Sequence, residues 1–217
     1  NRVFVLPCCL SIEQEMSLLA LPSAQALPQE PLNVLYIGRL DSYKRLDWLL
    51  EALSQLSTPW KLAVVGDGPY RSRFERLAQR LFSGEAPVHF FGRLSEAAKL
   101  EQLATADLLV LPSDRCNEAF GIVQLEAMAA GRLALAFDLP RSGMGWVGRL
   151  SGLPWSQSPE GLAEVLQRLA DQPALRQQLS VQARHRYLTV FARGVWLHQL
   201  RQFSNFVERG KVINPLE

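Results

Sequence analysis

The sequence contains little cysteine and histidine. Its 217 residues include three Cys and three His, and Cys8 and Cys9 are adjacent. This pattern excludes a disulfide framework and a zinc-ligand spacing, so we expect reduced cysteines and no metal. No apolar run approaches the roughly 20 residues that cross a bilayer, and residues 1–20 lack the basic and apolar segments of a signal peptide. We therefore expect a cytoplasmic protein.

The chain also lacks a strong excess of charge of either sign. The formal net charge is +2, with 20% charged and 48% hydrophobic residues. This composition is that of an ordinary globular domain and gives no indication of a nucleic-acid partner. The first residue is not Met, and we expect the chain to be a piece of a longer protein.

Short apolar runs alternate with segments of helical periodicity from residue 33 onward. This alternation predicts an α/β fold, a doubly wound, Rossmann-like parallel sheet with helices on both faces. Residues 1–32, rich in proline towards their end, are predicted to be a linker, 33–190 the domain, and 191–217 a C-terminal helical tail. The predicted strands are 33–37, 61–65, 88–91, 108–111 and 133–137, and the predicted helices 46–56, 74–81, 95–104, 121–130, 159–170, 174–187 and 192–207.

Ligands of such sheets bind at the carboxyl ends of the strands, so we expect the functional residues in the loops that follow the strands. After the first strand come Gly38, Arg39 and Lys44, without the G-x-G-x-x-G pattern of a dinucleotide site. Two cations beside a glycine suit a pyrophosphate. A solvated loop in which Lys44 pairs with Asp41 or Asp47 is the alternative, and the loop alone does not decide between them.

The next two loops have simpler explanations. In the loop 66–69, two glycines and a proline supply turn geometry and a helix start, and we favour this structural role over ligand contact. The loop 92–95 makes a tight turn, and Ser95 is the expected N-cap of the following helix.

The fourth loop contains the strongest signal, Glu118-Ala-Phe-Gly-Ile-Val-Gln-Leu-Glu126. Gly121 is expected at the start of a helix, where free amides and the helix dipole hold phosphate oxygens. Glu126 lies in an otherwise apolar helix and needs partners there, which ribose hydroxyls, an arginine or an exposed helix face would each provide. Glu118 suits sugar hydroxyls, or equally an N-terminal acid favoured by the dipole.

The E-x7-E pattern, with Glu-Ala-Met-Ala and Gly131 after it, resembles glycosyltransferase family 4 over residues 33–190. Gly38-Arg39 with Lys44 and Gly66-Asp67-Gly68-Pro69 match the same family in order and spacing. The resemblance implies the C-terminal, donor-binding domain of a retaining GT-B hexosyltransferase that needs no metal or cofactor. The N-terminal domain, which supplies most acceptor contacts, is then absent, and we expect this chain to be inactive alone.

The resemblance also implies residue roles. Arg39, Lys44 and Glu118 are the expected catalytic residues: the two cations hold the donor diphosphate, and Glu118 contacts the transferred sugar. Glu126 would bind the ribose. The remaining expected donor-binding residues are Gly38, Arg93, Leu94, Phe120, Gly121, Ile122 and Val123.

The pattern PS-x4-EAFGIVQLEAMA from Pro112 onward, followed by Ser142-Gly143-Met144-Gly145-Trp146-Val147, narrows the resemblance to bacterial enzymes of O-antigen or other surface-polysaccharide synthesis. By itself, this second segment has a simpler interpretation, a flexible loop with a buried Trp146. The expected partners are a GDP- or UDP-linked sugar, the missing N-terminal domain, and a glycan or lipid-linked acceptor. The basic and aromatic C-terminal helix suits packing on that domain, or peripheral contact with the inner face of the cytoplasmic membrane.

Two other functions remain to be distinguished from the transferase. A non-catalytic nucleotide-sugar-binding or scaffold module of the same fold would not transfer a sugar. A sugar-nucleotide epimerase of GT-B type is disfavoured by the E-x7-E pattern.

Overall fold

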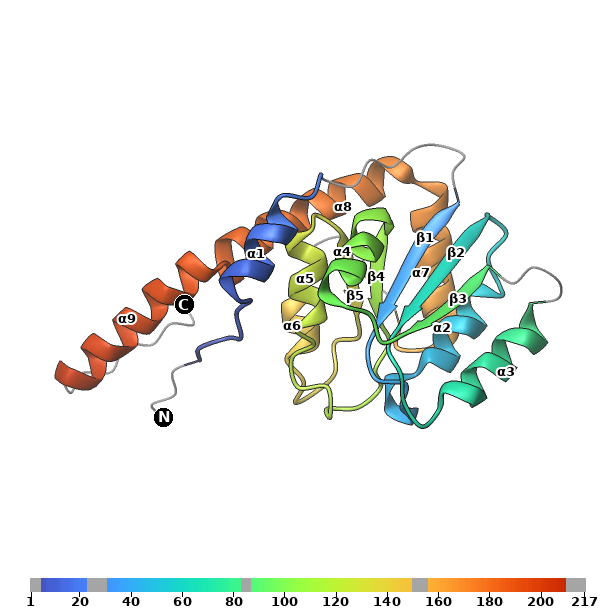
Figure 1. Cartoon of the computed structure of the whole chain (residues 1–217), viewed down its shortest axis with the longest axis horizontal. Helices are drawn as coiled ribbons and strands as arrows, with labels where there is room; N and C mark the ends of the chain where they lie inside the picture. The colour runs from blue at the N-terminus through green and yellow to red at the C-terminus, as the bar shows by residue number, and fades with distance from the viewer. Residues whose placement is uncertain (1–4, 23–30, 83–86, 150–155, 210–217) are drawn as a thin grey trace.

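A five-stranded parallel sheet forms the centre of the computed structural model (Figure 1). The structure describes residues 5–22, 31–82, 87–149 and 156–209. The strands are β1 (Leu32–Ile37), β2 (Trp60–Val65), β3 (Val88–Gly92), β4 (Leu108–Leu111) and β5 (Leu133–Ala136). The predicted strands are therefore confirmed to within a residue at each end.

The strand order is β3-β2-β1-β4-β5, with every pair parallel. The chain moves outward from β1 through β2 to β3, and then returns to the other side of β1 to form β4. The order therefore reverses between β1 and β4, and the loops that follow these strands flank the crevice where such sheets bind ligands. The β1 loop and the β4 loop are the two in which the sequence placed Lys44 and Glu118.

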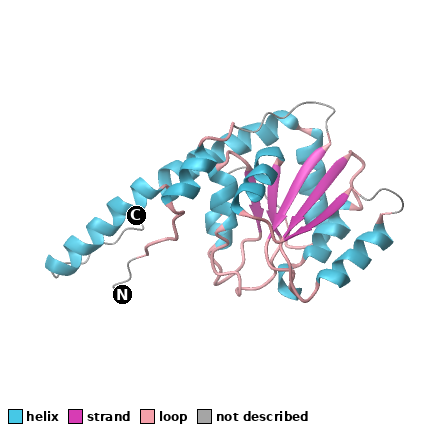
Figure 2. Ribbon diagram, viewed as in Figure 1, coloured by secondary structure: helices cyan, strands magenta, loops and turns pink. Residues whose placement is uncertain are grey.

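Helices cover both faces of the sheet (Figure 2). Alternate residues of β1 point to opposite sides: Val34 and Tyr36 belong to one buried cluster, and Leu35 and Ile37 to the other. The first cluster includes α2 (Leu46–Leu53), α3 (Arg71–Leu81) and α7 (Pro159–Asp171). The second includes α4 (Glu96–Thr105), α5 (Val123–Ala129) and α6 (Met144–Val147). The doubly wound architecture is confirmed.

Part of the segment predicted as a linker is folded. Helix α1 (Ile12–Leu19) begins with a capping box in which Ser11 and Gln14 bond each other's backbone amides. Leu18 is buried in the second cluster, and Glu15 accepts hydrogen bonds from the Tyr187 hydroxyl and the Arg193 amide. The short apolar stripe of α1 was overlooked because prolines dominate the segment after it. Residues 23–30 of that prediction lie outside the described residues.

The C-terminal region is a nearly continuous helical path. Helix α8 (Pro173–Arg186) passes into a π-helical turn, Tyr187–Phe191, and then into α9 (Arg193–Arg209). Figure 1 shows α9 extending away from the sheet beside α1. The predicted tail is thus helical as far as residue 209, and residues 210–217 lie outside the description. Within the described residues, no helix is long and apolar enough to cross a membrane.

Candidate functional site

The loop after β1 presents one exposed cation and one buried cation. Arg39 has 67% of its side chain exposed, and its Nε lies 3.4 Å from Asp41 Oδ2. Lys44 ends the 3-10 turn Ser42–Lys44 and is only 9% exposed. A Cβ on Gly38 would lie 3.8 Å from Lys44 Nζ, so the backbone approaches the ammonium closely at this position. No pattern in the sequence indicates that Lys44 is buried.

Lys44 pairs with Glu118, which lies 74 residues away along the chain. Both side chains are largely withdrawn from water. Burial lowers the pKa of Lys44, and the neighbouring Asp41 partly opposes this shift. The alternative of a surface pair with Asp41 or Asp47 is therefore wrong. The reversal of strand order brings the first and fourth loops together, and with them a cation and a carboxylate from the predicted catalytic set.

The backbone of the Glu118 loop is held by the loop after β5. Ser142 Oγ donates to the Glu118 carbonyl, and the Gly143 amide donates to the Ala119 carbonyl at 2.7 Å. A Cβ on Gly143 would meet the Ala119 carbonyl oxygen at 2.8 Å. The sequence taken locally predicts a flexible loop at Ser142 and Gly143. In the structure, these two residues hold the backbone of the Glu118 loop in place. No local pattern could reveal a contact between loops that lie 24 residues apart.

The helix after Glu118 begins later than predicted. The prediction was 121–130, but α5 is Val123–Ala129. Gly121 has φ +74°, a left-handed conformation incompatible with a helix, and an added Cβ would lie 2.6 Å from Leu111 Cδ2. The first hydrogen bond of this turn runs from the Gln124 amide to the Gly121 carbonyl, at 2.9 Å. The backbone amides of Ile122 and Val123 come before it in the chain. The expected helix-start amides are therefore present, Ile122 at the N-cap of α5 and Val123 at its first residue.

Gln124 is a site residue that the sequence did not single out. It is completely buried, and its amide nitrogen donates to the carbonyls of Phe120 (3.2 Å) and Met144 (3.1 Å). Phe120 packs against Phe191 and Trp146, with ring centroids 6.1 and 6.4 Å away. Trp146, predicted to be buried, is half-buried. Gln124 therefore links the loop at Phe120 to α6. The sequence does not indicate this role, because Gln124 lies inside the motif between the two glutamates.

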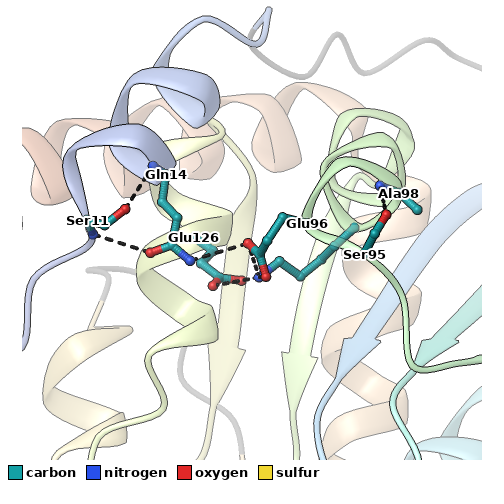
Figure 3. Close-up of polar contacts among 7 residues, drawn as sticks. Ser11, Gln14, Ser95, Glu96, Ala98 and Glu126 are labelled. Atoms are coloured by element: carbon teal, nitrogen blue, oxygen red, sulfur yellow. Dashed lines mark hydrogen bonds and ion pairs between the residues drawn. The ribbon is translucent and has the colours of Figure 1, made fainter.

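Glu126 lies in the wall of a pocket between α1 and α4 (Figure 3). It is 5% exposed, and its Oε1 accepts from Lys99 Nζ at 3.0 Å. Its Oε2 is buried and has no hydrogen-bond partner among the described residues. The pocket has a volume of about 740 Å³, within the range of small-molecule sites. The exposed-face alternative for Glu126 is wrong, and its protein partner is a lysine rather than an arginine.

The two acids of the motif therefore face different neighbours. Glu118 reaches Lys44 in the β1 loop, whereas Glu126 reaches Lys99 on α4. Their spacing of eight residues spans the left-handed turn at Gly121 and the first turn of α5. One carboxylate thus contacts the loop after β1, and the other lies in the wall of a pocket lined by α1 and α4.

The loop after β3 contributes less than the other loops. Arg93 is exposed, and Leu94 is half-buried against the second core cluster. Ser95 caps α4 as predicted, its hydroxyl accepting from the Ala98 amide at 3.2 Å. The structure thus leaves Arg93 accessible at the strand ends without fixing its side chain on another predicted site residue.

The glycines of the β2 loop have the structural role favoured from the sequence. Gly66 has φ +130°, and a Cβ there would lie 2.0 Å from the Gly38 carbonyl oxygen. A Cβ on Gly68 would lie 2.4 Å from the Leu40 carbonyl oxygen. These close approaches let the β2 loop support the loop that carries Arg39 and Lys44.

The described part of the chain contains no group of three or more His, Cys, Asp or Glu side chains placed to hold a metal ion. Cys8, Cys9 and Cys116 are free thiols.

Comparison with known families gives a match over most of the chain. A family model described as "Glycosyl transferases group 1" matches residues 20–186. D-rhamnosyltransferase WbpZ of Pseudomonas aeruginosa is 30% identical over 166 residues, which are 74% of this chain and 42% of that protein. D-inositol 3-phosphate glycosyltransferase of Streptomyces avermitilis is 33% identical over 174 residues, 73% of this chain and 37% of that protein. The chain spans less than half the length of these relatives.

Solved structures show the same fold. Sucrose-phosphate synthase from Thermosynechococcus elongatus superposes with a TM-score of 0.76 at 28% identity, over 95% of this chain and 53% of that one. Anabaena HepE, solved in complex with UDP, has a TM-score of 0.71 at 20% identity, over 82% of this chain and 49% of that one. The Rossmann-like sheet with its helical tail is thus the one found in GT-B glycosyltransferases.

Proposed function

The chain belongs to the glycosyl transferases group 1 family, and from that premise we propose that it is the donor-binding domain of a retaining hexosyltransferase. The observation that carries the proposal is the meeting of Lys44 and Glu118, which come from different strand-end loops. The relative named as a rhamnosyltransferase and the structural neighbour solved with UDP support a nucleotide-diphosphate sugar as the donor.

In this proposal the diphosphate lies beside Arg39 and Lys44, near the amides of Ile122 and Val123. Fixed positive charge stabilises the negative charge that develops on the leaving nucleoside diphosphate. Lys44 exchanges Glu118 for phosphate oxygens when the donor binds. The carboxylate of Glu118 is then free to accept hydrogen bonds from sugar hydroxyls.

Glu126 accepts from the ribose hydroxyls of the same donor. Its Oε2 supports this role, because a buried carboxylate oxygen without a partner is unfavourable and a ligand hydroxyl would satisfy it. Arg93, Leu94 and the backbone at Phe120 and Gly121 lie near the base and the sugar. No metal is needed, since protein cations neutralise the diphosphate.

The acceptor binds mostly to a second Rossmann-like domain, supplied by the remainder of a longer protein. The chain alone therefore binds the donor but does not transfer the sugar. The relative named D-rhamnosyltransferase WbpZ and the structural neighbour named lipopolysaccharide outer core galactosyltransferase WaaB favour a glycan or lipid-linked acceptor in bacterial surface-polysaccharide synthesis. Such a protein works in the cytoplasm or at the inner face of the cytoplasmic membrane.

A panel of ligands tests the donor site. We expect UDP, GDP or ADP to raise the midpoint of thermal unfolding of this chain, by an amount that grows with ligand concentration over the dissociation constant. A shift selective for GDP or for UDP identifies the base of the donor. If none of the three nucleotides changes the midpoint up to millimolar concentration, the domain is not a donor site and a scaffold role is favoured.

Arg39→Ala should weaken nucleoside diphosphate binding by about 10-fold, because it removes one charge-assisted contact from an exposed position. The effect should shrink at high salt, which screens exposed charges. Isothermal titration calorimetry at two salt concentrations measures both. The matched control is Arg80→Ala, an exposed arginine in the last turn of α3, far along that helix from the strand ends. Equal affinity in the two variants would remove Arg39 from the site.

A further inference from the structure

A chain of polar side chains links α1 to Glu126 across the pocket (Figure 3). Gln14 Nε2 donates to Glu96 Oε2 at 3.3 Å. Lys99 Nζ lies 3.0 Å from the Glu96 carboxylate and 3.0 Å from Glu126 Oε1. These polar contacts join three helices, α1, α4 and α5, that are far apart in the sequence.

Burial increases along this chain of contacts toward Glu126. The Glu96 side chain is 70% exposed, that of Lys99 16% and that of Glu126 6%. A salt bridge at the Glu96 end is solvated and weak, whereas removing one partner at the Glu126 end would leave a buried charge alone. Lys99 is thus the group that compensates the carboxylate in the pocket wall.

The orientation of each donor and acceptor is fixed by its neighbours. Gln14 Oε1 accepts from the Ser11 amide at 3.3 Å, which leaves its Nε2 to face Glu96. Lys99 Nζ occupies one oxygen of Glu126 and leaves Oε2 without a partner among the described residues. The arrangement holds the carboxylate in place while keeping one oxygen for another donor.

We propose that Lys99 is a positioning residue of the donor site, which fixes the Glu126 carboxylate in the pocket wall for the ribose hydroxyls. This inference rests on the proposed function and extends it to a residue on α4. Lys99 acts through Glu126 and does not itself hold the ligand. Its contribution to binding should therefore disappear when Glu126 is changed.

Electrostatics support this role. Burial raises the pKa of Glu126, and the Lys99 ammonium counteracts that rise. Burial opposes the charge on Lys99, but the carboxylates of Glu126 and Glu96 raise its pKa overall. The charged groups that face Glu126 are Lys99 and Glu96 on α4, with Glu13 of α1 lining the same pocket. Lys99 is the cation among these groups, so its removal should leave Glu126 protonated to a higher pH.

A double-mutant cycle tests the proposal on the whole chain. Dissociation constants of UDP, GDP and ADP are measured by calorimetry for the wild type, Lys99→Met, Glu126→Gln and the double variant. We expect each single variant to weaken the best-bound nucleotide by about 10-fold, in the range of one hydrogen bond to a charged group. The double variant should be no weaker than Glu126→Gln, since residues acting as one unit are not additive.

Two further measurements separate positioning from a general loss of structure. The 2′,3′-dideoxy form of the best-bound nucleotide lacks the ribose hydroxyls, so Lys99→Met should leave its affinity unchanged. In the wild type, affinity should rise with pH as Glu126 ionises, and Lys99→Met should move this rise to higher pH. Lys99→Arg keeps the cation and should restore most of the affinity, and Lys61→Met, at an exposed position on β2, is the matched control.

The outcomes are distinct. Additive losses in the double variant, or an equal loss of dideoxynucleotide affinity, would show that Lys99 contacts the ligand directly and would overturn the inference. Wild-type affinity in Lys99→Met would also overturn it while leaving the proposed function intact. A wild type that binds none of the three nucleotides contradicts the proposed function, and the inference falls with it.

Discussion

Lys44→Met should weaken nucleoside diphosphate binding by about 100-fold, close to 2.7 kcal/mol. Lys44 is the buried cation of the site and sits beside the close backbone approach at Gly38. A hydrogen bond to a charged group in such a place contributes about 1.5–3 kcal/mol. The loss should exceed that of Arg39→Ala, because Arg39 is exposed and screened. Calorimetric titration of the best-bound nucleotide measures the change.

The pairing of Lys44 with Glu118 gives this prediction its control. Lys44→Met leaves the Glu118 carboxylate partly buried without its cation, so stability should also fall. Adding Glu118→Gln removes that uncompensated charge, so the double variant should regain stability in chemical denaturation but should not regain nucleotide affinity. Lys61→Met reports the effect of losing an exposed lysine. Recovery of affinity in the double variant would mean that the pair is purely structural.

Gly66→Ala should lower the free energy of unfolding by about 3 kcal/mol. A φ of +130° is strained for any residue with a side chain, and strain of this kind costs roughly 1–3 kcal/mol. The added methyl group would also lie 2.0 Å from the Gly38 carbonyl oxygen, so backbone must move. Urea denaturation followed by circular dichroism measures the loss.

Gly194→Ala is the matched control for this substitution. Gly194 lies in the first turn of α9, and a Cβ there meets nothing within 4 Å. Alanine should therefore leave stability unchanged or raise it by up to about 1 kcal/mol, through helix propensity. Gly66→Ala should also weaken nucleotide binding, because the displaced Gly38 loop carries Arg39 and Lys44. A Gly66→Ala variant as stable as the wild type would show that the two loops do not need to approach so closely.

Much of the fold could be predicted from the sequence because it is encoded locally. Buried parallel strands appear as short apolar runs, and Leu108–Leu111 and Val34–Ile37 are such runs. The helix cap at Ser95 is likewise a short-range signal. Helix α1 is not apparent locally, because its apolar stripe is short and a proline-rich segment follows it.

One part of the site could be predicted from the sequence, and another part depends on tertiary packing. The order of strands and loops along the chain is enough to predict which strand-end loops contain the charged residues, because the carboxyl ends of parallel strands lie at one edge of the sheet, and Lys44 and Glu118 follow two such ends. The pairings could not be predicted in this way: Lys44 with Glu118, Lys99 with Glu126, and the Ser142 hydroxyl with the Glu118 carbonyl. Such contacts join residues 24 to 74 positions apart. They depend on how loops and helices pack, and no local pattern of residues records that packing.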